Sequence, residues 1–149
     1  MNVWLIASLV LVADQLTKAL VSMRFAPGES LPLLPPMLSL THVQNTGAAF
    51  GLFKGQQVLF IGLSLIVMGW LAWELRANRS MAPIVQWGSA LILGGAAGNV
   101  IDRLRHGYVT DFIDLHVWPV FNLGDSAITI GVTLLILHSF SRRKTGDQR

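Results

Sequence analysis

Residues 58–73 read VLFIGLSLIVMGWLAW and contain no charged side chain. A helix on the surface of a soluble bundle needs a charged face, and this stretch has none. The whole chain has the same character: 52% of its 149 residues are hydrophobic, 13% are charged, and the mean hydropathy is +0.55. Soluble domains carry about 25% charged residues. We therefore predict that this stretch is a helix that crosses a membrane.

Three further apolar stretches are long enough to cross a bilayer, which takes about 20 residues. The four predicted spans are residues 3–23, 58–76, 83–103 and 124–141. The chain length suits a single integral membrane domain, residues 1–149. The expected fold class is an all-α membrane protein with four transmembrane helices and a small extracytoplasmic antiparallel β-element.

Basic residues set the expected orientation. Six lie in the link between the second and third spans and in the tail: Arg76, Arg79, Arg142, Arg143, Lys144 and Arg149. Four lie in or beside the longer loops: Arg24, Lys54, Arg103 and Arg105. Because cytoplasmic loops carry the excess of Lys and Arg, we expect both termini in the cytoplasm. The outer loops are then residues 24–57 and 104–123, and the cytoplasmic tail is residues 142–149.

The first outer loop contains the alternating stretch MLSLTHVQNTGAAFGLF at residues 37–53. Alternation of this kind predicts a strand, in a small sheet or hairpin at the membrane surface. One side of the strand would carry Leu38, Leu40 and His42, and the other Ser39, Thr41 and Val43.

Several function classes are excluded by composition and motif. The chain has no cysteine, so it has no thiolate nucleophile, disulfide or Cys-ligated metal. Its His residues form no HExxH or i, i+4 pair, and no GxSxG or phosphate-binding loop is present, so we expect no metal and no cofactor. Although the pI is near 10, the low charge density does not make a nucleic-acid-binding surface. Ser–His and Ser–Lys dyads have no supporting motif.

Ionisable residues inside a span are costly and are therefore functional candidates. Asp14 and Lys18 stand at i, i+4 on the first span and can face each other. One interpretation is a self-neutralising pair near the outer end of the helix. The other is that Asp14 faces the interior of the bundle and orients further polar groups.

The third span ends GGAAGNVIDR at residues 94–103, where small residues let neighbouring helices approach. Asn99 and Arg103 share a helical face, with Asp102 beside them. An amide and a guanidinium on one face can bind a peptide carbonyl. The alternative is a structural ion pair of Arg103 with Asp102 or with Asp14.

Three acids follow in VTDFIDLHVWPVFNLGDSAI, namely Asp111, Asp114 and Asp125. Asp125 precedes an apolar run and is also a plausible helix N-cap. If Asp111 and Asp125 meet, like charge leaves the pair sharing one proton, which suits acid–base hydrolysis of a peptide bond. Spacing alone leaves Asp114 as a rival to Asp111.

Five sequence blocks resemble those of the lipoprotein signal peptidases, the bacterial type II signal peptidases. They are DQLTK (14–18), NTGAAF (45–50), GGAAGNVIDR (94–103), VTDFID (109–114) and FNLGDSAI (121–128), in family order. One position departs from the family pattern: Gly124 stands where the last block usually has alanine.

The resemblance implies a four-helix membrane aspartyl protease of the bacterial inner membrane, with its active site at the outer interface. Such an enzyme cleaves diacylglyceryl-modified prolipoproteins before the lipidated cysteine and is a target of the cyclic peptide globomycin. The catalytic pair corresponds to Asp111 and Asp125. Positions that line the site or support it correspond to Asn45, Asn99, Arg103, Asn122, Asp14, Lys18, Gly47, Gly95 and Asp102. We expect a monomer in contact with membrane lipids.

Residues 41–54, rich in Gly and Phe, could close over the substrate as a lid, which makes Gly47 and Gly51 positions to test. Two other functions remain open at this point. A small proton- or cation-coupled carrier would use Asp14, Lys18, Asp102 and Arg103 as a relay. A non-catalytic assembly protein would use the small-residue face and the outer loops for docking.

Overall fold

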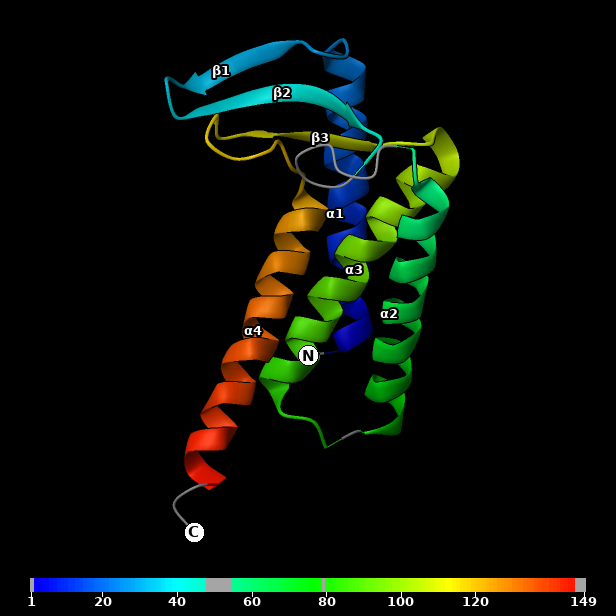
Figure 1. Ribbon diagram of the computed structural model, residues 1–149, viewed down its shortest axis with the longest axis vertical. Coiled ribbons are helices and arrows are strands. Elements are labelled where there is room, and N and C mark those ends of the chain that lie inside the picture. The colour runs from blue at the N-terminus through cyan, green and yellow to red at the C-terminus, as the bar shows by residue number, and fades with distance from the viewer. Residues whose placement is uncertain (1, 48–54, 79, 147–149) are drawn as a thin grey trace.

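Four long helices carry a three-stranded antiparallel sheet at one end (Figure 1). The computed structural model describes residues 2–47, 55–78 and 80–146, with side chains to residue 141. The elements are α1 (Val3–Arg24), β1 (Ser30–Leu34), β2 (Leu38–Asn45), α2 (Gln57–Ala77), α3 (Pro83–His106), β3 (Val109–Asp114) and α4 (Leu123–Gly146). Each helix is long and apolar enough to cross a membrane, α4 over Leu123–Ser141. The predicted fold class, with four such helices and a small antiparallel β-element, is confirmed.

The α3 helix is the centre of the bundle. It packs against each of the other helices, and α2 and α4 lie on either side of it (Figure 1). Pro83 occupies its first turn, and Gly107 ends it in the left-handed conformation at φ 75°. The helix therefore runs three residues past the predicted end of the third span at residue 103, into the segment expected to be a loop.

Two glycine pairs bring α3 and α4 together. A Cβ atom on Gly88 would meet the Gly131 carbonyl, and one on Gly95 would meet the Gly124 carbonyl. In both helices the two glycines are seven residues apart, which places them on one face. Since no side chain separates the backbones at these points, α4 approaches α3 closely at both of them.

The sheet has the order β1-β2-β3, so the long β2 strand pairs on both edges. The sequence reading placed a β-element in the first outer loop, but it missed β3, which comes from the second. Phe121 extends the pairing, because its carbonyl accepts hydrogen bonds from the Phe112 and Ile113 amides at 3.0 and 2.8 Å. The strand β3 is thereby held between β2 and the start of α4.

The predicted sidedness of β2 is wrong. Ser39 and His42 were expected on opposite sides of the strand, yet both are buried. The register with β3 shifts by one residue between Leu40 and Val43, which is a β-bulge. One extra residue reverses the alternation beyond that point, so no strict two-residue period could describe the whole strand.

Candidate active site

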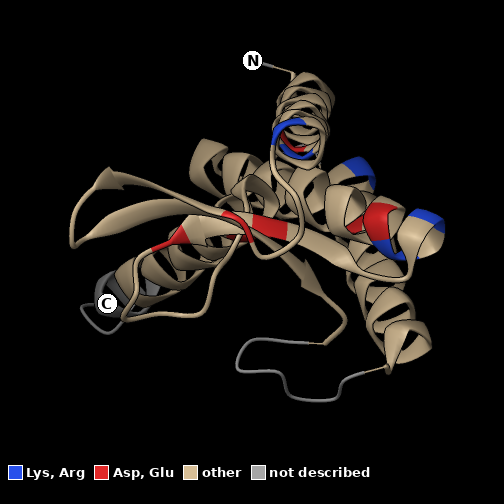
Figure 2. Cartoon of the chain, turned by 90° about the horizontal axis from the view of Figure 1, so that it is seen from above, with Lys and Arg blue, Asp and Glu red and all other residues tan. Residues whose placement is uncertain are grey.

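Asp111 lies on β3 and Asp125 in the first turn of α4, and Asn122 joins them. The Asn122 side chain donates from Nδ2 to Asp111 Oδ1 at 2.7 Å, and its backbone N–H donates to Asp125 Oδ2 at 3.3 Å. Asn122 is 0% exposed and Asp111 1%. In the view from above, some acidic positions lie near the middle of the molecule and others lie to either side of it (Figure 2). The two carboxyl groups therefore share one buried polar neighbour.

The start of α4 explains why this geometry forms. Asn122 immediately precedes the helix, and its Oδ1 accepts from the Asp125 backbone N–H at 2.8 Å. Together with the bond from the Asn122 backbone to the Asp125 carboxylate, this is a reciprocal capping box. The interpretation of Asp125 as the N-cap is wrong, because Asn122 caps the helix and Asp125 is three residues further on.

Each carboxyl group also accepts a second amide. Asn45 Nδ2 donates to Asp111 Oδ2 at 2.8 Å, and Asn99 Nδ2 donates to Asp125 Oδ1 at 2.8 Å. Burial raises the pKa of the Asp111 carboxyl to about 7, with the charge of Asp125 acting in the same direction and the Asn45 and Asn122 hydrogen bonds opposing it. Asp111 is thus able to hold a proton near neutral pH.

Lys18 is the centre of a second polar cluster beneath the pair. Its ammonium lies 2.8 Å from Asp14 Oδ2 and 3.2 Å from Asp102 Oδ2, and it donates to Asn99 Oδ1 at 2.7 Å. Asp14 in turn accepts from the Gly124 backbone N–H at 2.8 Å. Asp14 therefore faces the interior of the bundle and orients further polar groups, as the second interpretation has it. The first interpretation, a self-neutralising pair whose lysine snorkels toward the membrane surface, is wrong, because Lys18 is only 3% exposed and also pairs with Asp102.

A cavity of about 390 Å³ opens onto both aspartates. Arg103 reaches it from α3, with its guanidinium 5.0 Å from the Phe60 ring centre and one nitrogen 3.5 Å from the Gly47 carbonyl. Within the part of the chain that the structure describes, the buried Arg103 Nε has no hydrogen-bond partner. Among the described residues, Asp14 and Asp102 form ion pairs with Lys18 and not with Arg103. The alternative, a structural ion pair of Arg103 with Asp102 or Asp14, is therefore wrong.

Two glycines, one on α3 and one on α4, leave room for the Asp14 carboxylate. A Cβ atom on Gly98 would collide with the Asp14 carboxylate, and one on Gly124 would lie 3.0 Å from Asp14 Oδ1. Gly124, the departure from the family pattern, therefore lies at a close contact between α4 and the Lys18 cluster. Its missing methyl group leaves room for that contact.

The structure gathers all of the predicted site residues around the cavity or the Lys18 cluster. These are Asp111, Asp125, Asn45, Asn99, Arg103, Asn122, Asp14, Lys18, Gly47, Gly95 and Asp102. Residues 48–54, which include Gly51, half of the proposed lid and the end of the NTGAAF block, lie outside the described residues.

Asp114 stands apart from this arrangement. Its carboxylate accepts from Thr41 Oγ1 at 2.8 Å and from the His116 backbone N–H at 2.9 Å, and these bonds lower its pKa. His116 Nε2 also lies 3.0 Å from Ser39 Oγ, which completes a Ser–His–Asp chain. Ser39 is only 3% exposed, so its hydroxyl is not placed for attack on a substrate, and the chain ties the turn after β3 to the sheet.

Sequence reasoning missed two contributors. Gln15 donates to Asp102 Oδ1 at 2.9 Å and to the Gly98 carbonyl at 3.2 Å, and Phe60 lies under the Arg103 guanidinium. The polar amide of Gln15 inside a span was a usable signal, whereas one phenylalanine in an apolar helix was not. Across the described ranges, no group of three or more His, Asp or Glu side chains could hold a metal ion.

Known proteins match this chain over most of its length. The Lipoprotein signal peptidase of Halothermothrix orenii is 42% identical over 145 residues, 97% of this chain and 99% of the relative. That of Moorella thermoacetica is 47% identical over 131 residues, 88% of this chain and 87% of the relative. A solved structure described as "Bacterial membrane enzyme structure by the in meso method at 2.3 A resolution" superposes with a TM-score of 0.89 at 33% identity, covering 97% of this chain and 90% of that one.

The sequence model of the family described as "Signal peptidase (SPase) II" matches residues 6–141. This match includes every residue that contributes a side chain to the site. The chain is a multi-pass membrane protein with the fold of a bacterial membrane enzyme, and it belongs to the signal peptidase II family.

Proposed function

We propose that this chain is an aspartyl endopeptidase that removes the signal peptide from diacylglyceryl-modified prolipoproteins, cutting on the N-terminal side of the lipidated cysteine. The main support is that Asp111 and Asp125 both line one cavity and both accept a hydrogen bond from Asn122. The family relatives named as lipoprotein signal peptidases support the substrate class.

The two carboxyl groups would take different roles. The Asp125 carboxylate accepts a proton from a water molecule, whose oxygen bonds to the scissile carbonyl carbon, while the protonated Asp111 donates to the carbonyl oxygen. As the tetrahedral intermediate collapses, the C–N bond breaks and the leaving amine takes its proton from Asp125. Asp111 recovers its proton from the intermediate's hydroxyl, which becomes the carbonyl oxygen again. The raised pKa of Asp111 suits it to begin as the acid.

Neighbouring groups would hold the substrate. The free Nε of Arg103 and its position over Phe60 favour an interaction with a substrate carbonyl. A second, mostly apolar cavity of about 450 Å³ shares Asp125 with the site and is lined by Leu115, Trp118, Phe121 and residues of α4. It fits the acyl chains that the lipidated cysteine would carry.

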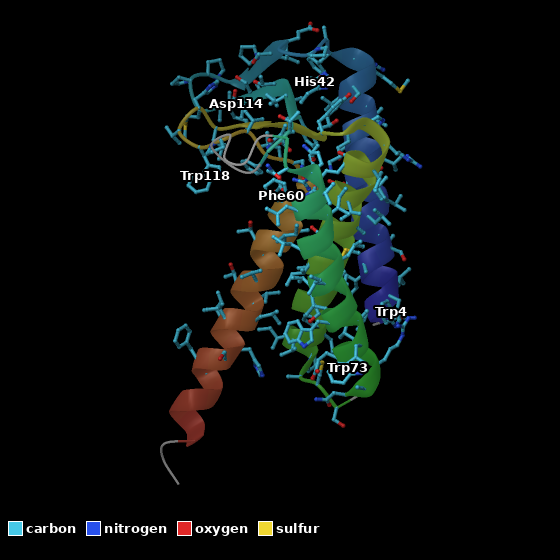
Figure 3. All side chains as sticks on the ribbon, turned by 45° about the vertical axis from the view of Figure 1, so that its right-hand side comes forward. Trp4, His42, Phe60, Trp73, Asp114 and Trp118 are labelled. Carbon is cyan, nitrogen blue, oxygen red and sulfur yellow. The ribbon has the colours of Figure 1, made fainter. Side chains whose placement is uncertain are left out.

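The orientation is part of the proposal. With both termini in the cytoplasm, the sheet and the two aspartates lie at the outer face of the bacterial inner membrane. Trp118 lies at the sheet end and Trp4 and Trp73 at the other (Figure 3), and all three are exposed, as expected of aromatic side chains at the two interfaces. We expect the enzyme to act as a monomer among membrane lipids and to bind globomycin in the cavity.

The test uses purified enzyme and two precursors, one diacylated and one not. We expect Asp111→Asn and Asp125→Asn each to lose at least about 1,000-fold in cleavage of the diacylated precursor. Asp114→Asn, the matched control on the same strand, should keep most of the activity. Full activity in either of the first two variants would contradict the mechanism, and equal cleavage of both precursors would contradict the substrate class.

The carrier alternative makes a different demand. A proton or cation relay needs groups that exchange partners, whereas Lys18 is held at once by Asp14, Asp102 and Asn99. We therefore favour the peptidase. pH-dependent flux through proteoliposomes containing the Asp125→Asn variant would reverse this choice.

A further inference from the structure

A cavity lies at the end of the helices remote from the sheet. Its volume is about 600 Å³, and α2, α3 and α4 all line it. Glu74 comes from α2, Val85 and Ser89 come from α3, and Leu135 and His138 come from α4. None of these residues takes part in the site around the two aspartates.

The two cavities lie along the same face of α3. Val85 and Ser89 line the remote cavity, while Ala96, Asn99 and Arg103 line the site. The steps from Val85 to Ser89, to Ala96, to Asn99 and to Arg103 are four, seven, three and four residues, which is the spacing of one helical face. One face of α3, between α2 and α4, therefore runs from the site to the remote cavity, with the buried Ile92 on it between the two.

The flanking helices repeat the pattern. On α2, Phe60 lines the site and Glu74 the remote cavity, fourteen residues away. On α4, Asp125 and His138 are thirteen positions apart, which is about 20 Å at 1.5 Å per residue. A helical segment of about 13 residues would span the same distance.

Charge distinguishes the remote cavity from an ordinary lipid-facing gap. Glu74 is the only acidic residue at this end within the described ranges. The other described acids all lie toward the sheet: Asp14, Glu29, Asp102, Asp111, Asp114 and Asp125. Among the described residues, the Glu74 side chain has no hydrogen-bond or ion-pair partner. A half-buried carboxylate at a membrane interface is complementary to a Lys or Arg supplied from outside the chain.

We propose that this cavity binds the basic amino-terminal end of the precursor's signal peptide, with Glu74 pairing with its Lys or Arg. The inference rests on the proposed function, since a signal peptide is the substrate's cleaved part. A signal peptide has a basic end followed by about 7–15 apolar residues. As a helix, that apolar segment spans about 10–22 Å, which matches the distance between the site and the remote cavity. The scissile bond and the basic end would thus be held at opposite ends of one face of α3.

The kinetic test compares three diacylated precursors that differ only in the amino-terminal end, which is basic, neutral or acidic. With purified enzyme in detergent, we expect Glu74→Lys to raise KM for the basic precursor about five-fold and to leave kcat within about two-fold. KM for the neutral precursor should not change. For the Glu74→Lys enzyme, KM should be lower for the acidic precursor than for the basic one. The matched control is Glu29→Gln, an acid near the sheet, which should change none of these values. Equal effects of Glu74→Lys on all three precursors would overturn the proposal.

Cross-linking tests the same contact without relying on cleavage. The chain has no cysteine, so Ser139→Cys introduces a single thiol into the wall of the remote cavity. With a mild oxidant added, its thiol should form a disulfide with a precursor whose basic end carries a cysteine. Leu137→Cys, on the same helix, 57% exposed and outside the cavity wall, should not.

The outcomes separate this inference from the proposed function. If the wild type cleaves no precursor, the proposed function fails, and the cross-link alone decides the docking. Equal cross-linking of the two cysteine variants would overturn the docking while leaving the peptidase intact. A Glu74 effect that follows the lipid headgroup and not the precursor would also overturn it, because the cavity would then be a lipid site.

Discussion

Replacing Lys18 by methionine should damage catalysis through Asn99. The Asn99 amide is held in one orientation, with Oδ1 accepting from Lys18 at 2.7 Å and from Asn122 Nδ2 at 3.2 Å, and with Nδ2 donating to Asp125 at 2.8 Å. Without the ammonium, the amide loses the stronger of the two donors that fix its oxygen. If the amide turns over, the Asp125 carboxylate loses the hydrogen bond from Asn99 Nδ2 and faces Asn99 Oδ1, which cannot donate.

The magnitude follows from that single hydrogen bond. A hydrogen bond to a charged group contributes about 1.5–3 kcal/mol, so kcat/KM should fall about 10- to 150-fold. Stability should fall as well, because Lys18 is only 4% exposed on its side chain and pairs with both Asp14 and Asp102. Breaking a buried ion pair by removing one partner costs about 3–5 kcal/mol.

A double-mutant cycle separates the two effects. Cleavage of the diacylated precursor is measured for Lys18→Met, Asn99→Ala and the double variant, at a temperature where thermal unfolding shows each to be folded. If Lys18 acts through Asn99, adding Lys18→Met to Asn99→Ala should cost little further activity. Arg24→Met, an exposed basic residue at the end of the same helix, is the control and should behave as wild type. Additive losses in the cycle would refute the positioning role.

Three other predictions concern pH, packing and the cation in the cavity. Because the Asp111 acid has a pKa of about 7, kcat/KM should fall as pH rises through 7. Asn45→Ala removes a hydrogen bond that lowers this pKa, so the fall in kcat/KM should move to higher pH. A pH profile unchanged by Asn45→Ala would count against Asp111 as the acid. Gly95→Leu should lower the free energy of unfolding by about 1–3 kcal/mol, measured as a lower thermal unfolding temperature, whereas Gly62→Leu, which has open space around it, should not. Similar shifts in both variants would contradict the close helix contact. Arg103→Lys should raise KM several-fold because an ammonium cannot stack as a planar group, and an unchanged KM would remove it from substrate binding.

The helices were predictable because each span is a local property of the chain. Uninterrupted hydropathy over residues 58–73 is enough to place α2, and the i, i+4 spacing is enough to pair Asp14 with Lys18. The positions of the two aspartates in one site came from the resemblance, since spacing alone could not choose between Asp111 and Asp114. What the sequence did indicate is that several acidic residues lie in apolar stretches, where a charged group is energetically unfavourable and is therefore a functional candidate.

What the sequence could not provide is the long-range geometry. The contact of Lys18 with Asp102 joins residues 84 positions apart, and nothing local selects it over a pair between Asp102 and Arg103. The β-bulge in β2 is a one-residue shift that alternation hides. The strand β3 is short and flanked by a helix end, and its pairing with β2 exists only once both outer segments meet. These are properties of the assembled bundle and not of any single segment.

The Lys18 cluster also bears on how the protein is built during synthesis. A chain that enters the bilayer helix by helix brings Asp14 and Lys18 in together, so the first helix carries no net charge from this pair into the lipid. Asp102 enters with the third helix, two helices later, and can then pair with the Lys18 ammonium that is already in the membrane. Without Asp14, the first helix would therefore enter the bilayer with an unpaired Lys18 charge. Such a variant should insert poorly, and this loss of insertion would precede any loss of cleavage.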